Sequence, residues 1–491
     1  MLKYEKYFKY AKYVFVAAPA LACLFMVLRY GVNTVIGDEW IMVHYGEKVQ
    51  AGTFTFADLW LPWNEHRQFF FKLAYLAVAF LTKFNSRAQM MVSFALVCAG
   101  YFFVIKYLFS KVKAEIWRCA GGFALGLLMF SPVQYENFLW GVLLAYFMAG
   151  ILPVISSYFL YRRISTGKRR YLAFAIALGV VASFSSLQGL LVWPAALAML
   201  VLHYRKAVFR QSVFFAWLAA GAASWFFYFF KLYEQAPGGT IPFRDNFLHI
   251  LKHPFFFLQS MARMAFTALS RVAFTVLLGK SSLSVSLFSL LCFFAAVCAV
   301  AVCGFRLVTR YDEDGFFPGA VALFGIMSVA AVSFGRSIWW LADVSRYTTA
   351  TLLIYVGALL YALVSRDMPK KEPAEARKNR EKLAMRGGGR LLKHAAAALM
   401  LAIVLASAIS WPEGFVACQI VRERNFVSYT ATLKEYKTAP DMALLLQGPP
   451  RFGDTEAYTA QKVRELARQV RELASFLEEN GYSVFAGQPI S

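Results

Sequence analysis

Residues 139–170 read LWGVLLAYFMAGILPVISSYFLYRRISTGKRR, an uncharged apolar run followed at once by a cluster of arginines and lysines. A helix of about 20 apolar residues crosses the roughly 30 Å hydrocarbon core of a bilayer. The same order, an apolar run and then a short polar segment, recurs along the whole chain. Because each spanning segment must satisfy its own backbone hydrogen bonds, the pattern predicts an all-α bundle of membrane helices.

The composition excludes a soluble globular protein. Of the 491 residues, 59% are hydrophobic and only 16% are charged, which leaves too little polar surface to cover a core of that size. The net charge of +23 could point to nucleic acid, but no basic helix or aromatic sheet motif accompanies it. The excess lies mostly in short loops, where it orients helices and meets anionic lipid. We therefore expect the lipid bilayer as a partner, and no nucleic acid.

Lysine and arginine collect in one set of connecting segments. These are 3–12, 106–118, 162–170, 205–210, 306–310 and 366–393. The positive-inside rule places such loops in the cytoplasm. The remaining connections are then outside: 34–87, 131–137, the turn near Gln188, 233–281, 335–347 and everything after Trp411.

Two further apolar stretches, 69–84 and 255–278, are predicted to be helices lying in the outer interface. A crossing by either would move every later basic loop to the other side, although the alternative that one or both span stays open. About eleven spans remain. They lie near 13–33, 88–110, 117–131, 139–161, 171–187, 190–204, 212–230, 282–304, 316–334, 347–364 and 393–411. An odd number places the N-terminus in the cytoplasm and the C-terminus outside.

The organisation that follows is a transmembrane bundle over 1–411 and a small outer C-terminal region over 412–491. Within the bundle, 34–87 forms the first outer loop with its interfacial helix, and 366–392 forms a basic cytoplasmic linker. In the C-terminal region, 455–479 has the apolar stripe of an amphipathic helix, and 482–485 reads as a short strand.

The outer segments carry the polar groups that could do chemistry. Asp38 and Glu39 follow the first span, where a carboxylate can accept a proton or bind a metal ion; solvated loop carboxylates are the alternative. Glu65, His66 and Arg67 begin the interfacial helix. Arg67 can bind a phosphate with two hydrogen bonds and His66 can move a proton, unless Glu65 and Arg67 simply pair with each other.

Amides and arginines occupy the other outer turns. Gln134, Glu136, Asn137 and Gln188 are the kind of groups that bind sugar hydroxyls, although helix capping and packing would use them equally well. An arginine at a membrane boundary is costly without a partner, so Arg336 and Arg346 indicate an anion, either Asp343 or a lipid phosphate. Arg346 and Tyr347 head the next helix, where backbone N–H groups also favour an anion.

Six short motifs all fall on the predicted outer side. They are Asp38-Glu39-Trp40, Asn64-Glu65-His66-Arg67, Gln134-Tyr135-Glu136-Asn137, Ser185-Ser186-Leu187-Gln188-Gly189-Leu190, Gly335-Arg336 and Ser345-Arg346-Tyr347. Together with an acidic residue in a large first outer loop, interfacial helices within that loop, about eleven spans and a small outer C-terminal tail, they make the chain resemble the GT-C-type integral membrane glycosyltransferases. More narrowly, the chain resembles a group of poorly characterised bacterial multi-span proteins of that type. The resemblance covers the chain from the first span to the tenth and is weak over the C-terminal tail.

The resemblance implies a GT-C-like glycosyltransferase of the bacterial inner membrane, with a cytoplasmic N-terminus and a periplasmic C-terminus. Its donor would be a sugar on polyprenyl phosphate, and its acceptor a cell-envelope glycan or glycolipid, such as lipopolysaccharide. Asp38 would be the base or a ligand of a divalent cation, Mg²⁺ or Mn²⁺, with Glu39 as the alternate; Arg346 and Arg336 would bind the lipid phosphate. A flippase for lipid-linked sugars and an O-antigen-type polymerase or ligase are the alternative functions.

Overall fold

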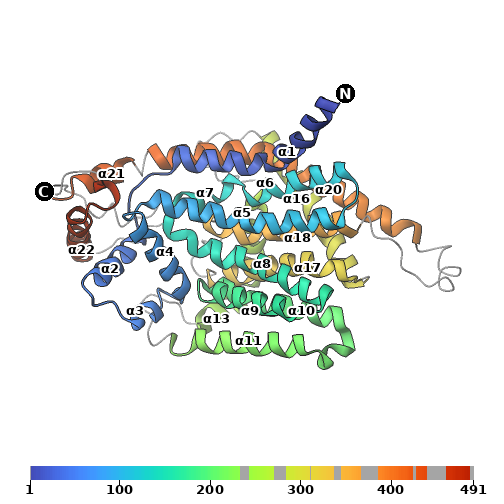
Figure 1. Ribbon diagram of the computed structural model, residues 1–491, viewed down its shortest axis with the longest axis horizontal. Helices are drawn as coiled ribbons and strands as arrows, with labels where there is room; N and C mark the ends of the chain where they lie inside the picture. Colours follow the sequence, from blue (N-terminus) through green and yellow to red (C-terminus); the bar gives the residue numbers. More distant parts are fainter. Residues whose placement is uncertain are drawn as a thin grey trace.

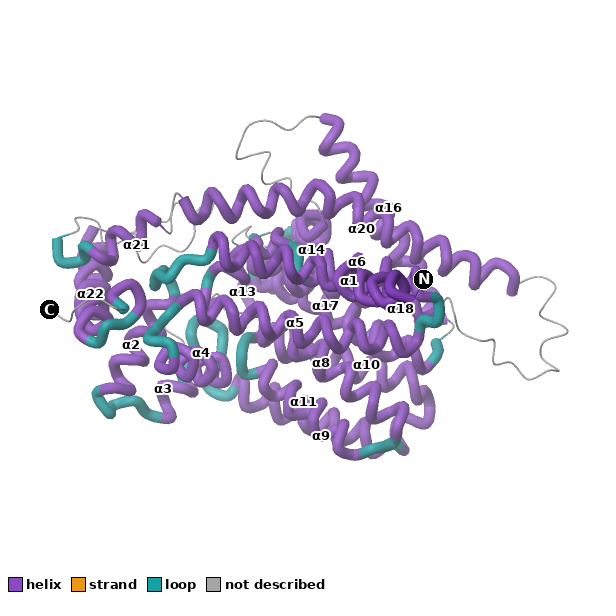
Figure 2. Tube along the Cα trace, turned by 45° about the horizontal axis from the view of Figure 1, so that its top comes forward, coloured by secondary structure: helices purple, strands orange, loops and turns teal. Residues whose placement is uncertain are grey.

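The computed structural model describes residues 2–232, 243–269, 283–309, 311–336, 344–365, 385–423, 427–438 and 460–486. Within these ranges the regular elements are α-helices and short 3-10 helices, and the one isolated β-bridge, between Trp63 and His66, builds no strand. The helices form an elongated bundle, seen along two directions in Figures 1 and 2. The described part of the chain confirms the all-α class.

Ten helical stretches in the described ranges are long and apolar enough to cross a membrane. They lie in α1 (Leu2–Tyr30), α5 (Ser86–Lys111), α6 (Glu115–Met129) with α7 (Tyr135–Leu139), α8 (Leu144–Thr166), α10 (Val192–Tyr204), α11 (Ser212–Phe229), α16 (Leu283–Thr309), α17 (Phe316–Gly335), α18 (Thr348–Ser365) and α20 (Met385–Val421). The eleventh predicted span, near 171–187, is α9, Arg169–Ser183, which packs along α8. Its 15 residues fall short of the length that a straight crossing needs.

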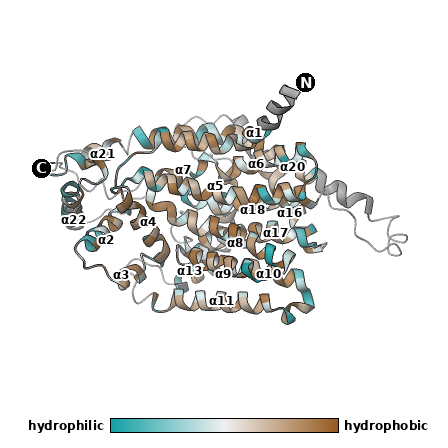
Figure 3. Ribbon diagram, in the orientation of Figure 1, coloured by the Kyte–Doolittle hydropathy of each residue, from teal (hydrophilic) through white to brown (hydrophobic). Residues whose placement is uncertain are grey.

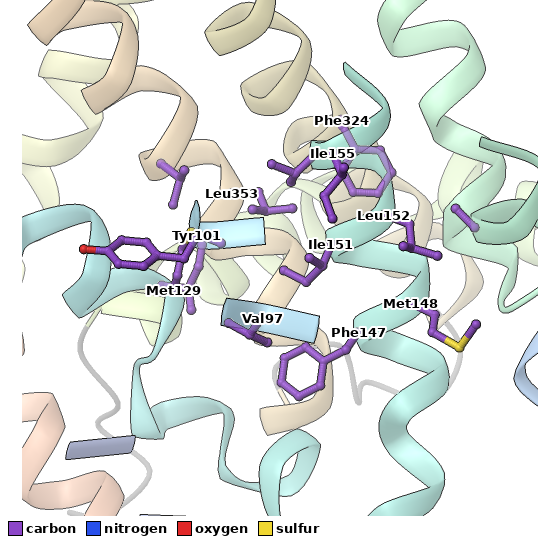
Figure 4. Close-up of a cluster of buried hydrophobic side chains, with 14 of the residues drawn as sticks. Val97, Tyr101, Met129, Phe147, Met148, Ile151, Leu152, Ile155, Phe324 and Leu353 are labelled. Carbon is purple, nitrogen blue, oxygen red and sulfur yellow. The ribbon is translucent and has the colours of Figure 1, made fainter. Parts of the chain in front are cut away.

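The core of the bundle lies around α8 and α18. Both helices are apolar on all sides, and almost all of their side chains are buried, as expected for helices surrounded by other helices. Figure 4 shows Phe147, Ile151 and Ile155 of α8 facing Val97 of α5 and, from α17 and α18, the residues Phe324 and Leu353.

Helices α17 and α18 approach each other unusually closely. A side chain on Gly325 would lie 2.8 Å from the backbone nitrogen of Ile354, and one on Gly357 would lie 2.5 Å from that of Ala322. Small residues allow such contact between membrane helices, where packing rather than water exclusion drives association. The two glycines therefore fix the hairpin that carries Arg336 at the end of α17 and Arg346 just before α18.

The basic connections meet at one end of the bundle. Lys12 pairs with Glu115 at 2.6 Å, and Lys111 pairs with Asp314 at 2.5 Å, so the loops beside α1, α5, α6 and α17 lie together. Figure 3 shows hydrophilic residues at this end and at the opposite one, with mostly hydrophobic helices between them. The first outer loop and the C-terminal helices lie at the opposite end (Figure 1). This arrangement agrees with the separation of basic and other loops that the charge pattern predicts.

The first outer loop contains α2 (Glu39–Gln50), α3 (Phe56–Trp60) and α4 (Phe69–Leu81). The predicted interfacial helix over 69–84 is α4, and its 13 residues are too few to span. The second predicted interfacial helix begins as α14, Pro254–Leu269, after α13, Phe243–Lys252; residues 270–278 lie outside the described ranges. Helix α14 packs against α17 and α18.

The C-terminal region contributes α21 (Val427–Lys434), α22 (Ala460–Glu479) and the 3-10 turn η9 (Ser483–Phe485). The amphipathic helix is present from Ala460, with Val470 and Leu477 buried. The predicted strand at 482–485 is wrong: Ser483 has a φ of 53°, which turns the chain away from an extended path. Of the predicted linker 366–392, residues 366–384 lie outside the described ranges, and the rest begins α20.

A leucine at position 325 tests the close packing of α17 and α18. Gly325→Leu drives a side chain into the α18 backbone, which cannot give way, so we expect a loss of about 2 kcal/mol or more of unfolding free energy. Thermal unfolding in detergent measures the loss. Gly304→Leu, on α16 in open space, is the matched control and should stay within about 0.5 kcal/mol of wild type. Equal stability of both variants would contradict the close approach.

Candidate functional site

Polar segments that lie far apart in the sequence meet at the end of the bundle opposite the basic loops. An ion pair of 2.9 Å joins Glu65 of the first outer loop to Arg336 at the end of α17. His66 contacts the turn after α9, where its Nδ1 accepts from the backbone N–H of Leu187 at 3.4 Å. The backbone N–H of Arg346 donates to Glu136 at 3.0 Å. We call this convergence the outer polar cluster; its residues are Asp38, Glu65, His66, Glu136, Tyr146, Arg336, Arg346 and Tyr347.

The turn between α6 and α8 holds the backbone of Arg346. Besides Glu136, the amide of Asn137 donates to the Arg346 carbonyl at 2.9 Å and to the Thr349 hydroxyl at 2.8 Å. That hydroxyl donates in turn to Gln134 at 2.6 Å. Gln134, Glu136 and Asn137 are therefore committed to protein partners, and what they do is fix the position of Arg346.

The guanidinium of Arg346 is buried without matching hydrogen bonds. The residue is only 9% exposed, and its Nε has no hydrogen-bond partner among the described residues. It lies 5.8 Å from the centre of the Tyr347 ring, a contact that supplies no counter-charge; the carboxylates of Glu136 and Asp38 act on it electrostatically. Asp343, the protein partner expected from the sequence, lies outside the described residues. A buried charge is costly unless it is paired, so this position favours the binding of an anion.

Asp38 is a further carboxylate whose charge acts on Arg346 and His66, after Glu136 and Glu65 respectively. It is the residue before α2, its side chain makes no capping hydrogen bond, and it is half-buried. Its negative charge acts directly on both Arg346 and His66, which places it inside the outer polar cluster. A half-buried carboxylate near a buried cation can accept a proton from a bound hydroxyl.

Glu39 points the other way, into the core beneath α2. One of its oxygens accepts from the backbone N–H of Ile36 at 3.2 Å, and the other from the Tyr75 hydroxyl at 3.4 Å. Gly141, at the start of the segment leading to α8, leaves room for this carboxyl, since a side chain there would lie 2.5 Å from it. Burial raises the pKa of Glu39 to about 8, against the opposing effect of these hydrogen bonds. Glu39 therefore anchors α2, and we do not retain it as an alternate base.

Glu65, His66 and Arg336 form a compact charged group. Burial alone would raise the pKa of Glu65, but the positive charge of the Arg336 guanidinium helps to hold it below the usual value. Burial lowers the pKa of His66, as do both arginines, so the imidazole is neutral at neutral pH. With Nδ1 accepting from Leu187, the proton sits on Nε2, 3.6 Å from Glu65. Arg336 also donates to the Tyr347 hydroxyl at 2.9 Å, so its charge is already engaged.

Arg67 lies outside the cluster. Its guanidinium donates to the carbonyls of Tyr228 at 2.6 Å and Trp60 at 2.9 Å, and also to the carbonyl of Phe230. Tyr228 and Phe230 are at the end of α11, whose last carbonyls have no partner within the helix. The predicted phosphate contact is therefore not what this structure shows, because Arg67 caps α11 from the first outer loop.

One amide and two tyrosines lie beside these charged groups. Gln188 is buried in η3 (Leu187–Leu191), beside the His66 contact. Tyr347 is joined by Tyr146 of α8, whose ring lies 5.9 Å from that of Tyr347 and 6.5 Å from that of His66. Sequence reasoning missed Tyr146 because it lies inside an apolar run, where a tyrosine is interpreted as part of a span. Only the folded structure brings it within electrostatic reach of Arg346 and Arg336.

The acidic groups of the cluster do not match a metal-binding set. In the described ranges, no group of three or more histidine, cysteine, aspartate or glutamate side chains is placed to hold a metal ion. Glu65 pairs with Arg336, and Glu136 accepts from the backbone of Arg346. We therefore route no step of the proposed chemistry through the Mg²⁺ or Mn²⁺ expected from the sequence.

The buried Glu39 gives stability a pH dependence. Its pKa rises on folding from 4.5 to about 8, so across that window the native carboxyl keeps a proton that the unfolded chain has lost. Stability should then fall as the pH rises, by up to about 1.4 kcal/mol per pH unit. Glu39→Gln should flatten the pH dependence of thermal unfolding between about pH 5 and pH 8. Glu472→Gln on α22, an exposed carboxylate whose partner Arg468 does not titrate in this range, should leave the slope unchanged. Parallel curves for wild type and Glu39→Gln would contradict the assignment.

Comparisons with known proteins give the chain no family. No protein-family model matches the sequence, and no curated protein matches it. Among solved structures, the chain is similar to the apo crystal structure of the Archaeoglobus fulgidus oligosaccharyltransferase, with 13% sequence identity and a TM-score of 0.43. The alignment covers 92% of this chain and 62% of the archaeal chain, so the chain spans less than two thirds of that enzyme. A similarity of this size assigns no activity.

Proposed function

We propose that the protein is a membrane glycosyltransferase that moves a sugar from a polyprenyl-phosphate donor to a cell-envelope glycan or glycolipid. The observation that carries this proposal is the buried guanidinium of Arg346, whose Nε has no partner among the described residues, with the carboxylate of Asp38 acting on it. The guanidinium of Arg346 suits an anionic leaving group, and the carboxylate of Asp38 suits a hydroxyl nucleophile. A lipid phosphate reaches such a site from the bilayer in which the helices lie.

The proposed reaction is a displacement at the anomeric carbon of the donor sugar. Asp38 takes the proton of the acceptor hydroxyl as its oxygen attacks that carbon. The bond between the anomeric carbon and the phosphate oxygen breaks, a new bond to the acceptor oxygen forms, and polyprenyl phosphate leaves with the electron pair. Negative charge grows on the phosphate during this step, and Arg346 is positioned to stabilise it.

The other cluster residues prepare the site. Glu65 and Tyr347 engage Arg336, which leaves Arg346 as the guanidinium with spare donor capacity. The neutral His66 can donate from Nε2 without adding a charge, and the Tyr146 and Tyr347 rings offer faces against which a sugar ring can stack. With the basic loops assigned to the cytoplasm, the site opens to the periplasmic side of a bacterial inner membrane, with the N-terminus inside and the C-terminus outside.

Two isosteric substitutions test the assignment. In purified protein incubated with defined polyprenyl-phosphate sugars, Asp38→Asn should lower kcat by about a hundredfold or more, because the general base is lost. Arg346→Gln should lower kcat to a similar extent, because the leaving phosphate is no longer stabilised. Release of polyprenyl phosphate is the measured quantity.

Matched controls come from the same end of the bundle. Glu47→Gln changes a carboxylate at the surface of α2, and Arg422→Gln changes a half-buried arginine that donates to the backbone of Arg29. Both should keep the wild-type kcat. Full sugar transfer by Asp38→Asn and Arg346→Gln would refute the proposal. Movement of intact donor across vesicles without release of polyprenyl phosphate would instead identify a flippase.

A further inference from the structure

The C-terminal region meets the first outer loop at a junction just ahead of Asp38. The junction is formed by residues Asn33, Thr34, Lys83, Phe84, Ser86, Tyr482 and Ser483. The side-chain amide of Asn33 donates to the Ser483 carbonyl at 2.9 Å, and its oxygen accepts from the backbone N–H of Ser86 at 3.0 Å. One side chain thus ties the chain that leads to Asp38 both to α5 and to the C-terminal region.

Further hydrogen bonds close the junction from the other sides. The backbone N–H of Ser483 donates to the carbonyl of Lys83 at 2.7 Å. The hydroxyl of Ser86 donates to the carbonyl of Thr34 at 3.0 Å, and the hydroxyl of Thr34 bonds to that of Thr430 in α21. Thr34, Ser86 and Ser483 are almost fully buried, so these bonds are shielded from water.

The backbone of the junction is strained. Lys83, Phe84 and Ser483 have φ values of 55°, 53° and 53°, in the left-handed region that favours glycine. Such conformations cost roughly 1–3 kcal/mol each and persist only where the surroundings impose them. Here the chain gives up local stability in order to hold one particular arrangement of three distant segments.

Aromatic packing extends the junction to α2. The ring of Phe84 stacks on Tyr482 with 5.2 Å between centroids and meets the edge of Phe476 at 6.3 Å. The tip of the same ring presses on Gly46, where a side chain would collide with it. Helix α22 also packs directly against α2. Asp38 therefore lies between Thr34, which bonds to Thr430 in α21, and Gly46, which rests on Phe84 and through that ring on Tyr482 of the C-terminal region.

We propose that the C-terminal region is a positioning element for Asp38 and that Asn33 is its main positioning residue. The side chain of Asp38 makes no capping hydrogen bond, so its place opposite Arg346 is set by the backbone on either side. This inference rests on the role given to Asp38 under the proposed function. It assigns to the region after α20 a part in the chemistry that acts through the backbone around Asp38.

The test separates the two hydrogen bonds of Asn33. Asn33→Asp keeps the oxygen that accepts from Ser86 but loses the donation to Ser483. We expect its kcat for sugar transfer to fall about tenfold, while KM for the donor stays within about twofold, because Asp38 is displaced and Arg346 is not. Tyr482→Leu removes the ring that stacks on Phe84 and should give the same division between kcat and KM.

A readout independent of activity accompanies the kinetics. In hydrogen exchange followed by mass spectrometry, both variants should expose the amides of residues 34–46 more rapidly, while those of α8 and α18 stay protected. Lys437→Ala breaks a surface ion pair with Glu478 inside the C-terminal region and is the matched control. It should change neither kcat nor exchange.

The outcomes distinguish this inference from the proposed function. If Asp38→Asn abolishes transfer while Asn33→Asp and Tyr482→Leu keep the wild-type kcat and exchange, the positioning role is overturned and the proposed function stands. If Asp38→Asn retains full transfer, the proposed function fails. The inference is then overturned as well, even if exchange at 34–46 is faster, because Asp38 has no catalytic role for the junction to support. A general loss of protection throughout the bundle would show a structural role only and would likewise overturn it.

Discussion

The structure depends on the cost of burying the Arg346 guanidinium at the head of a membrane helix. The start of α18 already carries the positive end of a helix dipole, so a second positive charge there is unfavourable unless an anion balances both. In the turn at 131–140, the carboxylate of Glu136 and the amide of Asn137 bond to the backbone of Arg346. The Nε of its guanidinium has no hydrogen-bond partner within the described residues. The protein thus maintains a buried charge in a defined place, which is how a site prepares for a ligand of opposite charge.

The helix hairpin of α17 and α18 makes that arrangement possible. Gly325 and Gly357 bring the two backbones into contact, so Arg336 and Arg346 stand at neighbouring helix ends. Glu65 makes the two arginines different. Its ion pair engages the guanidinium of Arg336, and the guanidinium of Arg346 is left for a ligand. The same packing that lowers the free energy of the bundle therefore also sets the charge distribution of the site.

Neighbouring residues in the first outer loop illustrate how local geometry divides roles. Successive side chains at the start of a helix point about 100° apart, so Asp38 and Glu39 cannot face the same way. Glu39 is buried under α2 as a largely protonated anchor at neutral pH, since its pKa is raised to about 8, and Asp38 faces the outer polar cluster. The C-terminal junction contacts the backbone ahead of Asp38, so the C-terminal region and the first outer loop meet next to this carboxylate.

The sequence by itself determined the helical class, most of the spans and the grouping of polar turns at one end. These follow from the length of each apolar run and the positions of lysine and arginine, which are local properties of the chain. It placed Asp38, Glu65, His66 and Arg346 on one side, but it could not separate Arg67, which caps α11, from Arg346, which lacks a full set of partners. Nor could it find Tyr146, or see that 482–485 turns instead of extending. Those outcomes depend on which distant backbone carbonyl, ring or carboxylate lies within a few ångströms of a side chain, and only the packed bundle sets those distances.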